Sequence, residues 1–261
     1  MPVTYESYLC LPELLDLQQP KSDPVEHDEP LFIVIHQTYE LWFKLMLHEF
    51  EKVGRNFRAG ELWEAVHTLK RCRTIMKTLV NQIDILETMT PMSFTSFRDR
   101  LDTSSGFQST QFRELEFMLG YKRPNVMKLA GINSGVGWER AIRRLEEPSL
   151  IDHFHRYLAD AGADIPAEVL DRDVSQPHVS NPKVQDELVR LYRERPDMGI
   201  LLELMTDFDE GLQEWRYRHV KMVERTIGDK QGTGGSPGVE FLRQSLFKPT
   251  FPDLWAIRSR L

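Results

Sequence analysis

The chain has 261 residues, of which 41% are hydrophobic and 28% charged, a balance typical of a globular protein with a sizeable core. Its net charge is −7, and its basic residues are scattered among acidic ones, which argues against nucleic acid and membrane as partners. The two cysteines have no metal-binding or redox spacing, and neither a signal peptide nor a membrane-spanning stretch is evident, so we expect a cytoplasmic protein.

The first half of the sequence shows helical periodicity. Apolar residues that recur at alternating intervals of four and three predict one long helix over 32–58 and another over 61–88. A break at Thr90-Pro91 precedes a short helix with Phe94, and a further helix is expected over 109–120.

The second half continues this pattern around an irregular centre. The sequence predicts a loop over 131–137, helix over 138–160 with an interruption at Pro148, and an irregular connection over 162–182. One long helix is then expected to about Ile227. A glycine-rich segment and a last helix over 239–247 follow, and the residue pair Ser236-Pro237 suits that helix's start.

These elements predict the fold class. Strand-like alternation is absent from the sequence, and the same kind of helical pattern flanks the irregular connection. We therefore expect one all-α domain over residues 1–261, a bundle of long helices.

Two histidines lie on apolar stripes of two separate predicted helices. His36 lies in FIVIHQTYELW and His219 in WRYRH. A structural role in the core is one interpretation, and a di-iron site is another, but the Glu-x-x-His motif ending at His67 has no partner motif. A haem with one axial histidine is the third, and Trp215, one turn before His219, suits the flat face of a porphyrin.

Two further features suit a small anionic ligand. Arg98, flanked by aromatic residues, can bind a carboxylate through two hydrogen bonds, or it can form a surface salt bridge with Asp99 or Asp102. The glycine-rich segment lacks the preceding strand of a nucleotide-binding loop. It can close over a ligand with the Thr233 hydroxyl, or be a plain flexible connection. The remaining histidines, such as His153, His155 and His178, are expected at the surface or in ordinary polar contacts.

Four segments of the chain together resemble the tryptophan 2,3-dioxygenase family. They are TYESYLCLPELLDLQQP, HDEPLFIVIHQTYELWFKLMLHEF, FRDRLDTSSGFQSTQFRELEFMLG and WRYRHVKMVERTIGDKQGTGGSPGVEFL, in the family's order. The resemblance runs from about residue 4 to 258 and is loose over 122–200. It implies an oxygenase that inserts O₂ across the indole C2–C3 bond of L-tryptophan, giving N-formyl-kynurenine in tryptophan catabolism.

The resemblance also implies a cofactor and residue roles. One haem b per subunit would have His219 as its proximal iron ligand, and His36 would be the distal histidine that binds the indole N–H. The tetrameric family would bring part of residues 1–30 into a neighbouring subunit's site. The other implied residues line the substrate pocket (Phe32, Phe94, Arg98, Thr233), the haem cavity (Ser105, Gly106) or the neighbour's site (Tyr5, Tyr8).

Three positions depart from the family's pattern. Phe94 stands where some members have tyrosine, Tyr39 where a small residue is common, and Asp102 where glycine or a small residue is frequent. These leave open a relative that mono-oxygenates a substituted tryptophan, such as a β-methyl derivative, to an oxindole-type product. A non-catalytic haem sensor is a more distant alternative, against which the carboxylate-binding Arg98 argues.

Overall fold

The structure is a computed structural model that describes residues 2–129, 135–233 and 238–261. Within these ranges the regular elements are all helices, which confirms the predicted all-α domain. Residues 131–134 of the predicted loop over 131–137, and the predicted helix start at Ser236-Pro237, lie outside the described residues. The end of that loop was predicted too late, because helix begins at Val136.

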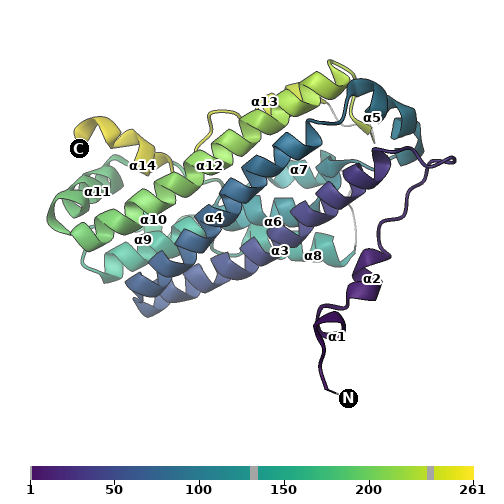
Figure 1. The fold of residues 1–261 in the computed structure, drawn as a ribbon. Coiled ribbons are helices and arrows are strands. Elements are labelled where there is room, and N and C mark those ends of the chain that lie inside the picture. The colour runs from purple at the N-terminus through teal and green to yellow at the C-terminus, as the bar shows by residue number, and fades with distance from the viewer. Residues whose placement is uncertain (1, 130–134, 234–237) are drawn as a thin grey trace.

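Three long helices run side by side through the centre of the molecule (Figure 1). They are α3 (Glu29–Ala59), α4 (Leu62–Leu86) and α12 (Pro196–Ile227), and α4 packs against both others. Gly60, with φ of +72°, ends α3 and allows the chain to reverse directly into α4. The apolar stripes meet in the core, where the Phe50 ring lies edge-on to Phe208 at 5.1 Å between centroids.

A second layer covers the other side of α3. It consists of α6 (Thr110–Leu119), α7 (Pro124–Leu129), α8 (Val136–Glu146), α9 (Leu150–Asp160) and α10 (Ala167–Leu170). The predicted interruption at Pro148 is confirmed, since α8 ends before it and α9 begins after it. Ser149 starts α9 with a capping box, in which its backbone N–H donates to Asp152 Oδ2 at 2.7 Å.

The single long helix that the sequence predicted up to Ile227 is wrong. Two helices, α11 (Pro182–Glu194) and α12, are separated at Arg195. Pro196 lacks an N–H and disfavours helical geometry in the residue before it, and Arg195 accordingly has φ of −130° and ψ of 85°.

The C-terminal elements also differ from expectation. Helix α13 (Val239–Arg243) is shorter than the predicted helix over 239–247, and Phe247 has a φ of +57°. The sequence did not predict α14 (Pro252–Ala256) or the final turn η4 (Arg258–Arg260). These short elements have too few residues for a periodic apolar pattern to be visible.

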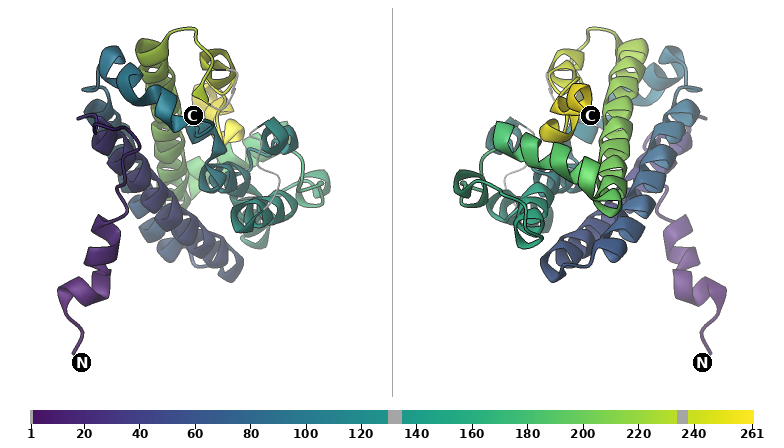
Figure 2. Two further views of the ribbon diagram at one scale, coloured as in Figure 1. Left: turned by 90° about the vertical axis from the view of Figure 1, so that its right-hand side faces the viewer. Right: turned by 90° about the vertical axis from the view of Figure 1, so that its left-hand side faces the viewer.

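The N-terminal residues form an arm that extends away from the bundle (Figures 1 and 2). It carries two short helices, α1 (Tyr5–Leu9) and α2 (Leu11–Leu15), in which Tyr5 and Tyr8 are 76% and 74% exposed. None of the described helices is long and apolar enough to cross a membrane.

Candidate functional site

A cavity of about 260 Å³ lies between α3, α12 and the short helix α5 (Pro91–Arg98). The turn η1 (Asp99–Leu101) leads from α5 to η2 (Gly106–Gln108), which closes another side of the cavity. The structure brings together here every site residue expected from the sequence except Tyr5 and Tyr8, namely Phe32, His36, Phe94, Arg98, Ser105, Gly106, Trp215, His219 and Thr233.

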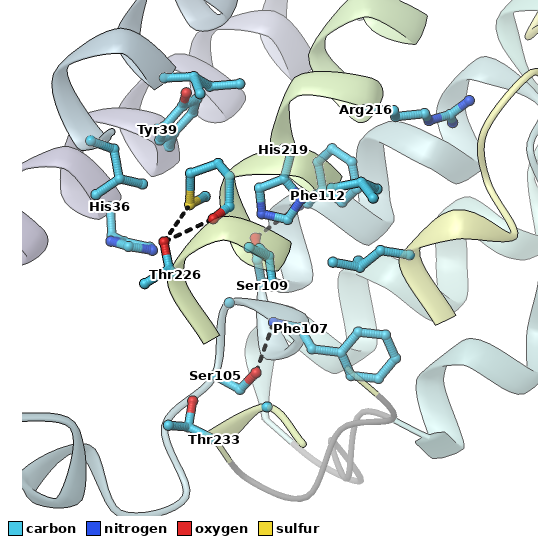
Figure 3. Close-up of a pocket in the computed structure, with 18 of the residues that line it drawn as sticks. His36, Tyr39, Ser105, Phe107, Ser109, Phe112, Arg216, His219, Thr226 and Thr233 are labelled. Carbon is cyan, nitrogen blue, oxygen red and sulfur yellow. Dashed lines mark hydrogen bonds between the residues drawn. The ribbon is translucent and has the colours of Figure 1, made fainter. Parts of the chain in front are cut away.

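His36 and His219 reach this cavity from different helices, α3 and α12 (Figure 3). The Nδ1 atom of His36 lies 2.7 Å from the carbonyl oxygen of Phe32. A carbonyl oxygen can only accept a hydrogen bond, so Nδ1 carries the proton and Nε2 is left as an acceptor. Burial lowers the pKa of His36, although Phe32 O and Glu40 oppose the shift, so the ring is neutral at pH 7.

The ring of His219 is held in a parallel stack with Trp215. Their centroids are 5.0 Å apart and the planes differ by 5°. Burial, assisted by His36 and Arg113, lowers the pKa of His219 to about 4. The ring is therefore neutral, which is the form of histidine that binds a metal ion.

Aromatic side chains form the wall beside His36. The Phe32 ring lies 4.1 Å from the His36 ring and 5.7 Å from the ring of Phe94. Phe97 completes the cluster behind them, at 5.5 Å from Phe94. Such a wall suits a flat apolar group such as an indole ring.

The sequence left open a surface salt bridge between Arg98 and Asp99 or Asp102. Within the described part of the chain, Arg98 pairs with neither aspartate. Its Nη2 instead donates to the carbonyl oxygen of Gln231 at 2.5 Å. Gln231 lies just before Gly232 and Thr233, so this bond joins the end of α5 to the glycine-rich segment. Arg98 also lines the cavity, where a carboxylate can compete for its guanidinium.

Sequence reasoning missed a buried charged cluster on the cavity wall. Arg113 and Arg123 donate to the Glu116 carboxylate, and Arg216 approaches it at 3.9 Å. Three guanidinium groups share one carboxylate, which leaves two positive charges in excess. The Nε–H of each arginine has no partner among the described residues. A helical signal existed for Arg216, since a residue three positions before His219 shares its face of the helix.

Charges within this cluster stabilise one another. Burial opposes ionisation of Glu116, but Arg113, Arg123 and Arg216 outweigh it and hold the pKa of this carboxyl below its ordinary value. The excess positive charge and the free N–H groups make this wall suited to anionic groups.

The family departures have visible structural consequences. Tyr39 lines the cavity, but its hydroxyl donates to the carbonyl oxygen of Leu79 at 2.7 Å, and burial raises its pKa to about 12. It therefore packs as a neutral group against α4. Asp102 has φ of +49° and ψ of −118°, a conformation that favours glycine. Phe94 has no hydroxyl to offer to the cavity.

The other histidines lie away from the cavity. His153 Nε2 is 2.9 Å from Arg58 Nη1, and His178 Nε2 is 2.9 Å from Asp253 Oδ2, which are the polar contacts expected. His155, in contrast, is 2% exposed, and its Nδ1 lacks a partner within the described ranges. The sequence pattern did not indicate this burial.

The fold and the site define an all-α protein with a buried cavity that presents two neutral histidines and a guanidinium. A family model described as tryptophan 2,3-dioxygenase matches residues 1–132 and 186–261. The chain is 54% identical to a tryptophan 2,3-dioxygenase of Herpetosiphon aurantiacus, over 99% of this chain and 98% of the relative. It is 51% identical to a tryptophan 2,3-dioxygenase of Anaeromyxobacter dehalogenans, over 99% of this chain and 96% of the relative. It is 44% identical to one of Kineococcus radiotolerans, over 99% of this chain and 91% of the relative.

The chain belongs to the tryptophan 2,3-dioxygenase family, which confirms the family predicted from its motifs. The residues that the family model does not match, 133–185, lie within the stretch where the sequence resemblance was loose.

Proposed function

We propose that this protein is a haem-dependent dioxygenase that converts L-tryptophan and O₂ into N-formyl-kynurenine. The observation that carries the proposal is the convergence of neutral His36, neutral His219 and Arg98 on one cavity, in a chain of this family. The mono-oxygenating relative and the haem sensor gain no support from the relatives, which carry the dioxygenase name.

The residues of the cavity fit one haem b. His219 would offer a neutral nitrogen for the iron, and the parallel stack with Trp215 would hold the orientation of its ring. The unpartnered Nε–H groups of Arg113, Arg123 and Arg216 suit the negatively charged propionates. Ser105 and Gly106 line the same cavity, and at Gly106 an added Cβ would have no heavy atom within 4 Å.

The chain itself supplies orientation and charge recognition. When bound, the haem supplies the iron chemistry that activates O₂. His36 accepts a hydrogen bond from the indole N–H at Nε2, because its Nδ1 proton is committed to Phe32 O. An indole N–H is a very weak acid, so His36 positions the substrate more than it removes a proton.

The amino-acid end of the substrate meets polar groups at the cavity mouth. Arg98 binds the carboxylate, and this releases its bond to Gln231 O. Thr233, two residues further on, contacts the same end with its hydroxyl. The rings of Phe32 and Phe94 hold the indole, so the reacting C2–C3 bond is kept in one orientation relative to the iron site.

We further propose a cytoplasmic homotetramer built as a pair of dimers. The arm leaves Tyr5, Tyr8 and Leu15 largely exposed, at 71–76%. Apolar side chains at the end of an extended arm favour burial against another subunit. In the tetramer, Tyr5 and Tyr8 reach a neighbour's substrate site.

The product formed by haem-loaded, reduced protein from L-tryptophan under ¹⁸O₂ tests the reaction. Two labelled atoms in a ring-opened product support the dioxygenase. One labelled atom, or turnover only with a substituted tryptophan, would replace it by the mono-oxygenating relative, and no product despite a normal haem spectrum would favour the sensor.

Two variants test the division of roles between the histidines. His219→Ala is expected to lose the normal axial ligation in the absorption spectrum, and His36→Ala to retain haem but lose rate or substrate affinity. A His36→Ala protein that cannot hold haem would contradict these assignments.

A further inference from the structure

We propose that His155, His178 and Asp253 form a binding site for a divalent transition-metal ion, with Zn²⁺ as the best-fitting ion. The three residues come from α9, from the connection before α11 and from α14. None of them lines the cavity that holds His36 and His219, and α14 lies at the end of the bundle away from α5 (Figure 1). The site is therefore independent of the proposed haem chemistry.

The ligand atoms lie close to the geometry that zinc requires. One nitrogen or oxygen of each residue lies within 4.8 Å of those of the other two, and His178 Nε2 is 2.9 Å from Asp253 Oδ2. Zinc bonds of ~2.0–2.1 Å in a tetrahedron place ligand atoms ~3.3 Å apart, so movements of about an ångström close the set. Two imidazoles and one carboxylate leave a fourth position for water.

His155 carries an unsatisfied atom that points to a ligand. It is 2% exposed, and its Nδ1 has no hydrogen-bond partner in the described parts of the chain. Buried polar atoms are nearly always paired, so a ring nitrogen without a partner in this position is unusual. Burial, with His178 next in effect, lowers the pKa of His155 to about 4, which keeps the ring neutral and ready to coordinate.

Asp253 is held as metal-binding carboxylates commonly are. Its Oδ1 accepts from Ser180 Oγ at 2.6 Å, from Asn181 N at 2.9 Å and from Gln185 Nε2 at 3.0 Å. These donors fix the carboxylate and leave Oδ2 beside His178. Outer partners of this kind orient a ligand before the ion arrives.

A neighbouring ion pair positions His178. Asp152 on α9 accepts from Arg172 Nε at 2.6 Å and from Arg172 Nη2 at 3.0 Å. Arg172 Nη1 also donates to the carbonyl oxygen of Gln176 at 2.7 Å, which fastens the chain two residues before His178. Of the charged groups that act on His155, Asp152 and Arg172 cancel each other's charge, and Asp253 remains as a negative charge that favours a cation.

The bound ion would tie three distant segments together. His155 and His178 lie in the part of the chain that the family model does not match, so the site is not among the features that this model describes. The connection before α11 is poor in apolar residues, and a metal crosslink would stabilise it against α9 and α14.

The test uses haem-loaded protein, so that iron occupies His219, after treatment with a chelator. Zn²⁺ is added, and uptake is measured by elemental analysis after gel filtration, affinity by calorimetry and Tm by circular dichroism. We expect one zinc per chain and a rise in Tm. His155→Gln should weaken zinc binding by at least about 100-fold, because an outer partner alone is worth about 10–100-fold. His153→Gln, its matched control, should bind zinc as the wild type does.

Two results would overturn the proposal. One is a wild-type protein that takes up no zinc at micromolar concentration and shows no rise in Tm. The other is zinc binding that is unchanged in both His155→Gln and Asp253→Asn, a pair that retains side-chain size at each position. The wild-type measurements decide the question even where a variant fails to fold.

Discussion

Glu116 offers a sharp test of the buried charged cluster. The change Glu116→Gln retains the size of the side chain and one acceptor oxygen, but it removes the negative charge shared by Arg113, Arg123 and Arg216. The side chain of Glu116 is 4% exposed, so water cannot replace the lost carboxylate. We expect a large loss of stability.

The size of the loss follows from the geometry. At an effective dielectric constant of about 20, unit charges ~4 Å apart attract by about 4 kcal/mol. Three guanidinium groups lie at or within this range, but the cost of burying the carboxylate offsets much of the attraction. Removing one partner of such a buried group costs about 3–5 kcal/mol in the free energy of unfolding, because the remaining charges stay buried and unpaired.

Urea denaturation at pH 7 measures the effect, with Glu64→Gln as control. Glu64 pairs with Lys52 at the surface, 3.1 Å away and 60% exposed, so its change should cost less than about 1 kcal/mol. Haem-loaded Glu116→Gln should lose less stability than the haem-free variant, because the propionates of the proposed haem would supply negative charge to the same arginines. A loss below about 1 kcal/mol in the haem-free protein would refute the reasoning.

The same variant has a definite pH dependence. The folded state lowers the pKa of Glu116, so its stabilising effect is present above the carboxyl's unfolded pKa of ~4.3 and is lost as the pH falls through the lower folded value. The stability difference between wild type and variant should therefore shrink only in acid. A difference that stays constant down to the acid transition would contradict the role of charge.

Three further predictions concern the cavity and the turn at Asp102 beside it. The pKa of His36 lies below the ordinary histidine value of ~6.5, so its ring should stay neutral at pH ~6.5 and above. We therefore expect kcat/KM to fall only below pH ~6.5, and an apparent pKa above ~6.5 in the pH profile would contradict the assignment. Arg98→Lys should raise KM for L-tryptophan about 10–100-fold in steady-state assays, with little change in the exposed control Arg100→Lys. Asp102→Gly should raise stability to urea by about 1 kcal/mol, and a loss would show that the side chain matters more than its strained backbone.

Local sequence was sufficient for the long helices, apart from the break at Arg195, and for naming candidate site residues that the structure brings to one cavity. The apolar stripes of α3, α4 and α12 are many turns long, so their helical period is visible without any tertiary information. The same stripes placed His36 and His219 on inward faces, and the motifs around them identified the family. Pro196 separates α11 from α12, and the sequence prediction missed this helix break although its physical cause is local.

Tertiary packing decided which buried charged and polar side chains meet, and a periodic apolar pattern carries no information about such partners. Arg113 and Glu116 lie on α6 and Arg123 follows shortly after that helix, but Arg216 comes from α12, and only packing buries it with the others beside the cavity. The same holds for His155, whose burial against His178 and Asp253 depends on contacts between residues far apart in the chain. Helical period reports which face of one helix is apolar, but the partners of a buried charge or imidazole are set by the meeting of distant segments.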